Sequence, residues 1–216
     1  QFQINSTTAG TQAFSSTSSL TDGGFVVTWT DYSGEDGSGK GIFGQRYDAS
    51  GNKVASEFQI NTHTSGDQSW SDIASLPNGG FVVTWNSSGQ DSSGEGVYAQ
   101  RYSSSGEKDG TEFRVNTYQT GNEMHSEVTA LNDGGYVVIW YSDTHTDDTN
   151  YGIHGQRFDA SGAAVGSQFL VNTDKSNAQQ YPEIAPLADG GFVIAWQSYT
   201  QDGSGYGIYA QRYSSA

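Results

Sequence analysis

The sequence predicts an all-β protein built as a four-bladed β-propeller, and three observations support this. The segment Gly23–Trp29 recurs with its Gly-Gly pair starting at residues 23, 79, 134 and 190, so the repeat period is 55 or 56 residues. Each copy is followed by Gln, Arg and an aromatic residue, as in Gln45–Tyr47. The chain also holds 29 Gly and only 3 Pro, a composition suited to many short strands joined by tight turns. A repeat of this length is one structural unit that needs its neighbours to complete a core.

Each repeat is expected to form a four-stranded antiparallel sheet. The second copy contains four strand-like runs of β-branched and aromatic residues, at 71–76, 81–85, 96–102 and 112–116. Asn78-Gly79 lies between the first two runs, and the other copies have Asp-Gly there, which supplies the positive φ of a tight hairpin. Apolar residues at both parities in the middle runs indicate a sheet covered on both faces. Such a sheet is one blade of a propeller.

The four repeats are predicted to form one domain over residues 1–216, with units near 1–56, 57–111, 112–167 and 168–216. The first residues, Phe2–Asn5, have the pattern of a fourth strand, whereas the last copy stops after its third strand at Gln211–Tyr213. We therefore expect the ring to be closed by pairing of the two termini. A monomer is expected, and the alternative is half of an eight-bladed ring completed by a second chain.

Charge and composition exclude several classes of partner. The formal net charge of −15 comes from 24 acidic and 9 basic residues, and such a surface repels nucleic acid and anionic lipid. No apolar run approaches the length that crosses a bilayer, so no membrane insertion is expected, and any export signal should lie outside these residues. The absence of Cys excludes disulfides and thiolate metal sites.

A calcium site is one candidate feature of the loops between the second and third strands. Each of these loops carries an Asp, followed in three copies by Gly-Ser-Gly or Ser-Ser-Gly. Hard cations bind carboxylate, hydroxyl and carbonyl oxygens, and Gly lets a loop wrap around an ion. The candidate metal ligands are Asp36, Asp91, Asp147 and Asp202. The alternative is that these Asp residues only form side-chain turns.

A ligand-binding site is predicted where the first strand of each repeat begins. An aromatic ring beside amide or carboxylate groups suits a sugar, because the ring covers the C–H face while polar groups bond the hydroxyls. The ring-bearing residues are Phe14, Trp70, His125 and Tyr181, and the polar residues two positions earlier are Gln12, Gln68, Glu123 and Gln179. The alternative is that the rings fill a narrow channel or pack between blades.

Other recurring residues are assigned to structure. The Trp that ends each second strand is expected to pack between blades, and the Arg of each Gln-Arg-aromatic motif to pair with a local carboxylate. No residues are assigned to catalysis, since the four His do not recur in register and no Ser-His-Asp or zinc spacing is present. Asp72, Glu127 and Glu183 recur on the first strand and could furnish the carboxylate pair of a glycan-active enzyme, but Ser16 interrupts this series in the first copy.

The repeat resembles the tandem repeats of very large secreted bacterial proteins of the RTX and haemolysin-type calcium-binding group, including adhesins. The resemblance covers the whole chain and rests on Asp-Gly-Gly-Phe-Val-Val-Thr-Trp, on Gly-Ile-x-x-Gln-Arg-Tyr-Asp-Ala-Ser-Gly-Asn and on Glu-Phe-Gln-Ile-Asn-Thr. It implies a module that is secreted or displayed on a bacterial cell surface. It implies no catalytic residue, and the nonapeptide that binds Ca²⁺ in RTX tails is missing.

Together these patterns predict a non-enzymatic extracellular module that binds a cell-surface or matrix glycan, with Ca²⁺ as a possible cofactor and no other. The first alternative is a structural spacer of a large adhesin with no ligand of its own. The second is a polysaccharide-active enzyme, a hydrolase or lyase.

Overall fold

The chain folds into four antiparallel sheets that follow one another in sequence order, in a computed structural model that describes residues 1–91, 93–143 and 151–215. In each sheet, every strand pairs with the strand that follows it in the sequence. We call the sheets blades 1 to 4. Blade 1 contains β1 (Gln12–Ser19), β2 (Phe25–Asp31), β3 (Gly41–Tyr47) and β4 (Lys53–Gln59). Blade 2 contains β5 (Gln68–Ser75), β6 (Phe81–Ser88), β7 (Glu95–Tyr102) and β8 (Lys108–Arg114). Blade 3 contains β9 (Glu123–Ala130), β10 (Tyr136–Ser142), β11 (Gly152–Phe158) and β12 (Ala164–Leu170), and blade 4 contains β13 (Gln179–Pro186), β14 (Phe192–Tyr199) and β15 (Tyr206–Tyr213).

The predicted all-β class and the division into four blades are confirmed. Four strands form each of the first three blades, and the first three runs expected in the second copy match β5 to β7, whereas β8 begins four residues earlier than the expected run 112–116 and ends two residues before it. Within the described ranges there is no helix, and so none that is long and apolar enough to cross a membrane.

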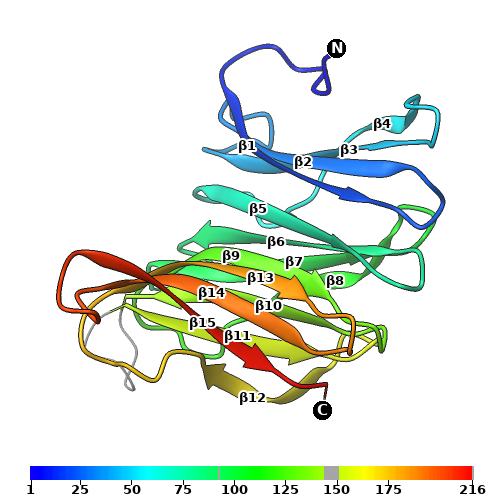
Figure 1. The fold of residues 1–216 in the computed structure, drawn as a ribbon. Helices are drawn as coiled ribbons and strands as arrows, with labels where there is room; N and C mark the ends of the chain where they lie inside the picture. Colours follow the sequence, from blue (N-terminus) through cyan, green and yellow to red (C-terminus); the bar gives the residue numbers. More distant parts are fainter. Residues whose placement is uncertain (92, 144–150, 216) are drawn as a thin grey trace.

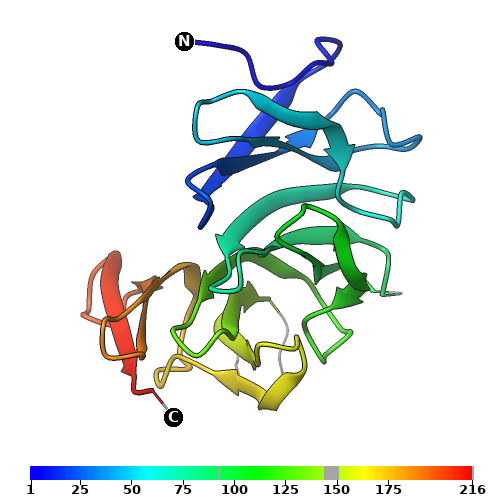
Figure 2. The ribbon, with the colours of Figure 1, turned by 90° about the vertical axis from the view of Figure 1, so that its right-hand side faces the viewer.

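The pairing of the two termini is not seen, and this corrects one detail of the prediction. Blade 4 has three strands, and β15 has a neighbour on one side only. Residues Phe2–Asn5 are not in a strand and lie against blade 1, where the Phe2 and Tyr47 ring centroids are 5.6 Å apart. Figure 1 shows the two ends of the chain at opposite ends of the row of blades, and Figure 2 shows the blades along an open arc. The fourth strand of blade 4 is therefore absent from this arrangement.

The hairpins between the first and second strands need both glycines of the repeated pair. In blade 1, Gly23 has a φ of 84°, and its N–H donates to the Leu20 carbonyl at 3.0 Å. A Cβ on Gly24 would clash with the carbonyl oxygen of Tyr47 on the neighbouring strand. The first glycine therefore supplies a left-handed conformation and the second a close approach of two backbones.

The core lies between successive blades. Val26, Ile42 and Ile60 of blade 1 pack against Val83 and Trp85 of blade 2, and equivalent clusters join blades 2 and 3 and blades 3 and 4. The four repeated Trp residues are buried, at 4%, 0%, 0% and 7% exposure for Trp29, Trp85, Trp140 and Trp196, which confirms their predicted packing role.

The repeated Arg residues bind carboxylates, as predicted. Arg46 pairs with Asp22 at 2.8 Å and Arg157 with Asp133 at 2.6 Å, which ties the third strand of blades 1 and 3 to the first hairpin of the same blade. In blade 2, Arg101 pairs instead with Asp109 of β8, at 3.0 Å. The Asp partners are about half exposed, so each pair contributes little to stability.

Candidate active site

The first strand of every blade contains a β-bulge, and the bulge carries the aromatic residue that the sequence singles out. The register between the first and second strands shifts at this point in all four blades. Phe14, Trp70, His125 and Tyr181 have φ values of 54°, 59°, 50° and 51°. A positive φ in a residue other than Gly costs of the order of 1–3 kcal/mol, and such strain is concentrated at functional sites. The same strained conformation in four blades makes these strands a candidate site.

The bulges bring the four rings into one row across the blades. The centroid distances are 3.8 Å from Phe14 to Trp70, 4.7 Å from Trp70 to His125, and 4.9 Å from His125 to Tyr181. Phe14, Trp70 and Tyr181 remain 43%, 38% and 51% exposed, whereas burial of His125 lowers its pKa and favours the neutral imidazole. The structure thus places the four predicted ring-bearing residues together on an open surface. We call this set the aromatic row.

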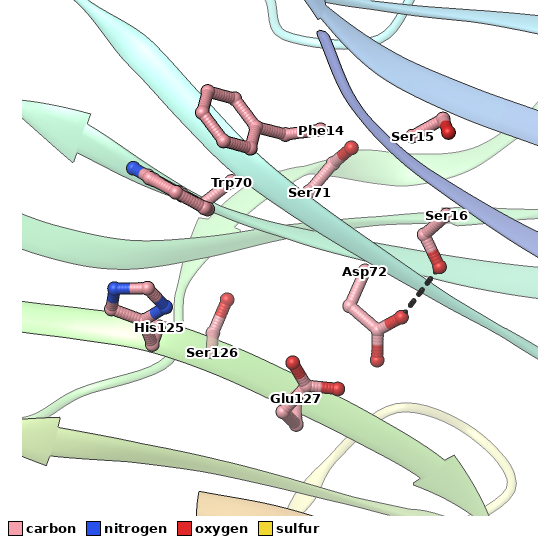
Figure 3. A pocket seen from close by; sticks show the side chains of 9 residues that line it. All are labelled: Phe14, Ser15, Ser16, Trp70, Ser71, Asp72, His125, Ser126 and Glu127. Carbon is pink, nitrogen blue, oxygen red and sulfur yellow. Dashed lines mark hydrogen bonds between the residues drawn. The ribbon is translucent and has the colours of Figure 1, made fainter. Parts of the chain in front are cut away.

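A cavity of about 340 Å³ lies beside the aromatic row and is lined with carboxylates and hydroxyls. Figure 3 shows Phe14, Trp70 and His125 on one side of it, with Asp72 and Glu127 on the other. The first strands of blades 1, 2 and 3 supply all of the lining residues: Phe14, Ser15, Ser16, Trp70, Ser71, Asp72, His125, Ser126 and Glu127. An apolar wall opposite a few convergent polar groups is the usual form of a small-molecule site.

Asp72 is held from both sides by neighbouring blades. The Ser16 hydroxyl of blade 1 donates to Asp72 Oδ1 at 2.7 Å, and the Val128 N–H of blade 3 donates to Oδ2 at 2.9 Å. Ser16 occupies the position of Asp72 in the first repeat, so the residue that interrupts the carboxylate series is the one that orients Asp72. The side chain of Asp72 therefore has little freedom to move.

Glu127 lies next to Asp72 and titrates far from the usual range of a carboxyl group. Burial, the charge of Asp72 and a hydrogen bond with Asp72 raise the pKa of Glu127 to about 9, and the charge of Glu183 adds to the effect. Two carboxyl groups in contact cannot both ionise easily, so Glu127 holds a proton at neutral pH. A carboxylic acid kept protonated in an open cavity is a group that can donate a proton to a ligand.

The third carboxylate of the series, Glu183, is exposed on β13. Its charge reaches Glu127, as the raised pKa of Glu127 shows, yet it is not among the residues that line the cavity. The three acidic residues occupy equivalent positions on three first strands, Asp72 on β5, Glu127 on β9 and Glu183 on β13. These strands are adjacent, since β9 contacts both β5 and β13.

The polar residues predicted to accompany the rings lie inside the blades. Gln68, Glu123 and Gln179 are buried, and Gln12 is half-buried. Gln12, Gln68 and Glu123 each accept a hydrogen bond from the repeated Asn, for example from Asn61 Nδ2 to Gln68 Oε1 at 3.0 Å. Burial and the charges of Asp91 and Asp143 raise the pKa of Glu123 to about 8. The structure does not bring these four residues to the surface of the aromatic row, because they tie the end of one strand to the start of the next.

The candidate calcium ligands are spread over separate blades. Asp36, Asp91 and Asp202 each accept a hydrogen bond from the N–H two residues later, at 3.1 to 3.2 Å, which is the geometry of a side-chain turn. A Cβ on Gly41, Gly96 or Gly207 would come within 2.9 Å of these carboxylates. Over residues 1–91, 93–143 and 151–215, no group of three His, Cys, Asp or Glu residues could hold a metal ion. The structure thus supports the turn alternative and gives the calcium prediction no support, and Asp147 lies outside the described residues.

Sequence reasoning finds the rings and the three carboxylates but not the feature that joins them. The bulge that aims each ring leaves no signature, because Phe, Trp, His and Tyr are all disfavoured at positive φ. The sequence signal that points to the site is the recurrence of aromatic and acidic residues two positions apart.

Comparisons with known proteins identify the fold. No sequence-family model matches the chain, and no curated protein sequence does. Among solved structures, an endo-arabinase from Bacteroides thetaiotaomicron matches 98% of this chain and 79% of its own, with a TM-score of 0.60 and 15% identity. An α-L-arabinanase from Penicillium chrysogenum in complex with arabinobiose matches 94% of this chain and 62% of its own, with a TM-score of 0.69 and 14% identity. An α-L-arabinofuranosidase from Fusarium graminearum, also with arabinobiose, matches 95% and 63%, with a TM-score of 0.62 and 13% identity.

These similarities confirm the propeller fold and correct the predicted function. The chain spans less than two thirds of the second and third structures, and at this identity the likeness concerns the fold. The similar structures are named as enzymes that act on arabinose-containing glycans, which contradicts the prediction of a non-enzymatic binding module. The alternative of a polysaccharide-active enzyme is favoured instead, and it agrees with the carboxyl pair in the cavity.

Proposed function

We propose that this protein is a polysaccharide-active enzyme, a glycoside hydrolase whose site is the cavity beside the aromatic row. The observation that carries the proposal is the contact of Glu127 with Asp72 in an open cavity, which keeps Glu127 protonated at neutral pH. Glycoside hydrolysis requires such an acid to protonate the oxygen of the leaving group. The fold of the similar structures supports the same class of reaction.

Glu127 is the proton donor in this proposal. Its raised pKa gives it a proton to donate at a pH where an ordinary Glu has none. Asp72 is a positioning residue, because the bonds from Ser16 and Val128 fix its carboxylate, and after burial its charge is the next largest cause of the raised pKa of Glu127. The donor and the group that tunes it are thus supplied by adjacent blades.

Glu183 is the second carboxylate of the reaction. A hydrolase needs a base or nucleophile on the other side of the sugar, about 5 to 10 Å from the acid. Asp72 affects Glu127 through a hydrogen bond as well as through its charge, so it is assigned to tuning the acid, whereas Glu183 is exposed and affects Glu127 only through its charge. Glu183 therefore either attacks the anomeric carbon or activates the water that does.

The aromatic row binds the substrate. Its exposed ring surfaces extend over four blades, which suits several successive sugars of a polymer more than one monosaccharide. The exposed Ser15 hydroxyl at the cavity can bond a sugar hydroxyl. Arabinan is the first polymer to test, since the similar enzymes are named for it.

A secreted or cell-surface location stays a prediction that is compatible with this activity, because polysaccharides are extracellular substrates. It rests on the resemblance to repeats of secreted proteins. The proposed reaction assigns no role to calcium, and Asp36, Asp91 and Asp202 of the predicted calcium loops form side-chain turns.

The release of reducing ends from a panel of polysaccharides, with arabinan first, tests the proposal. The wild-type protein should cleave at least one polymer, and Glu127→Gln should lower kcat by about 10²- to 10⁴-fold, as expected for loss of a general acid. Glu183→Gln should cause a loss of similar size. Glu107→Gln, an exposed carboxylate in the turn between β7 and β8, is the control and should leave the rate unchanged. Cleavage of no polymer, or full activity of Glu127→Gln, would overturn the proposal.

A further inference from the structure

The basic residues of this chain lie away from the cavity beside the aromatic row. Lys and Arg number nine against 24 acidic residues, all nine lie in the described ranges, and none of them lines the cavity. Lys40 comes near one end of the row, where its Nζ lies 5.2 Å from the centroid of the Tyr32 ring, but Asp67 pairs with it at 2.9 Å. A negatively charged sugar in the cavity would therefore meet no base among the residues that line it.

A second group of carboxylates lies beyond the aromatic row, at the loop end of the blades. β10 ends opposite the start of β9, which puts Asp143 on the loop side of His125, whereas the cavity acids lie on the hairpin side. Burial raises the pKa of Glu95 at the start of β7, and the charges of Asp67 and Asp143 raise it further against the opposing charge of Lys40. Asp67, Glu95 and Asp143 are thus neighbours, and we call them the rim acids.

The rim acids lie close to the aromatic row. The ring of Tyr141 stacks on His125 with a centroid distance of 5.4 Å. Burial raises the pKa of Tyr141 to about 12, and the charges of Glu95 and Asp143 are among those that add to the effect. The row therefore runs between two groups of acids, the rim acids on one side and the cavity acids on the other.

Rings and carboxylates in this arrangement attract the same kind of ligand, a cation. An ammonium group within about 6 Å of a ring centroid is attracted by the negative face of the ring, most strongly by that of Trp. Trp70 lies in the middle of the row and is 38% exposed, so such a face is available to a ligand. The carboxylate of Asp72 lies on the cavity side of the same rings.

The arrangement suits a ligand with several positive charges along its length. The acids are divided by the row, and over residues 1–91, 93–143 and 151–215 no three His, Cys, Asp or Glu residues could hold one metal ion. The row extends over four blades, so it suits a polymer whose units each carry an amine. A polymer of acidic sugars would instead bring its carboxylates beside Asp72 and the rim acids, and such like-charge contacts disfavour binding.

We propose that the substrate of this site is a polymer of amino sugars, whose protonated amines lie over the aromatic row between the rim acids and Asp72. The inference rests on the proposed function, because it names the substrate class of the same cavity. The neutral polymer arabinan lacks these amines and should be cleaved more slowly than a polymer of amino sugars.

Binding of two matched hexasaccharides tests the charge preference separately from catalysis. One is a hexamer of β-1,4-linked glucosamine, and the other is cellohexaose, which has a hydroxyl in place of each amine. The host is Glu127→Gln, which slows cleavage and keeps the charge of the cavity, since Glu127 is already protonated at neutral pH. Trp70 is 38% exposed and the other four Trp residues at most 7%, so quenching of Trp fluorescence reports contact with the aromatic row.

The glucosamine hexamer should bind about 10-fold more tightly than cellohexaose at low salt and mildly acidic pH, where its amines are protonated. The difference should shrink in about 1 M salt, where the screening length is about 3 Å. Glu95→Gln should weaken binding of the glucosamine hexamer by about 2- to 5-fold. Lys40→Gln should strengthen it, because Asp67 loses its partner. Neither change should alter the binding of cellohexaose, and Glu107→Gln in the turn between β7 and β8 is the control for both sugars.

Equal affinity for the two hexamers at low salt, or a preference that salt does not reduce, would overturn the proposal. Release of reducing ends by the wild-type protein is measured in parallel on both hexamers and on arabinan. Equal binding together with cleavage of a neutral polymer would refute the amino-sugar substrate and leave the hydrolase in place. Selective binding of the glucosamine hexamer with no cleavage of any sugar would support the charge preference and refute the hydrolase.

Discussion

At the scale of single residues, the site depends on a carboxyl pair held across three blades. Ser16 and Val128 orient Asp72 by hydrogen bonds of 2.7 and 2.9 Å, and Asp72 in turn raises the pKa of Glu127. The folded protein therefore holds a proton on Glu127 over a pH range in which the unfolded chain has released it. This difference in proton binding links the site to the stability of the whole protein.

Stability should fall as the pH rises toward 9. A Glu in the unfolded chain has a pKa near 4.5, whereas Glu127 and Glu123 have pKa values of about 9 and 8 when folded. Between pH 4.5 and the folded pKa values, these two groups bind more protons in the folded state than in the unfolded state. Their contribution to the free energy of unfolding is therefore greatest below pH 4.5 and decreases as the pH rises to the folded pKa values. Thermal melts from pH 5 to 9 should show this decline. Glu127→Gln should flatten it and melt a few °C above the wild type at pH 9, since about 1 kcal/mol shifts Tm by about 2–4 °C in a chain of this size. A parallel decline in both proteins would show that Glu127 does not titrate as described.

At the scale of elements, the bulge in each first strand determines where one aromatic ring per blade lies. A regular strand would alternate its side chains between the two faces, and the bulge re-aims one ring per blade into the aromatic row. The neighbouring blade holds this conformation, as when the Trp70 N–H donates to Thr30 Oγ1 at 3.2 Å. The strain is therefore offset by contacts between blades.

Replacement of Trp70 by Gly and by Ala separates the strain from the ring. Both variants remove the ring and should weaken substrate binding by a similar factor. At a φ of 59°, Gly should be more stable than Ala by about 1 kcal/mol in chemical denaturation. Ser69, on the same strand before the bulge, has no positive φ and should show the opposite order, with Ala more stable than Gly. An Ala variant as stable as the Gly variant at position 70 would contradict the assignment of strain there.

At the scale of the whole molecule, the repeat makes the fold predictable, and the strand pairs and hairpins follow from it. The turn glycines and the buried Trp residues recur in all four copies, and the Arg–Asp pair of the first hairpin recurs in three. Ring closure was expected because Phe2–Asn5 resembles a fourth strand, and the segment does lie against blade 1. A local pattern does not show whether this segment also pairs with β15, and in the structure β15 pairs with β14 alone.

The site is less predictable than the fold, because its geometry arises between repeats. The positions of the rings can be read from the sequence, but Gln68 and Glu123 were expected beside them and lie buried instead, bonded to Asn61 and Asn116. The role of Ser16 also depends on the distance between blades 1 and 2, which no local pattern encodes. The sequence patterns therefore favour a binding function, whereas the raised pKa of Glu127 beside Asp72 supports the proposed proton transfer.

The pH dependence of polysaccharide hydrolysis tests the central claim most directly, namely that protonated Glu127 carries the reaction. The wild-type kcat/KM on a cleaved polymer should stay high through neutral pH and fall only as the pH approaches the raised pKa of Glu127, about 9. Ser16→Ala removes the hydrogen bond to Asp72 Oδ1 and leaves Glu127 unchanged. The protein should still fold, and the alkaline limb of kcat/KM should shift. A limb near pH 4 to 5, where an ordinary Glu titrates, or no hydrolysis at any pH, would contradict the account.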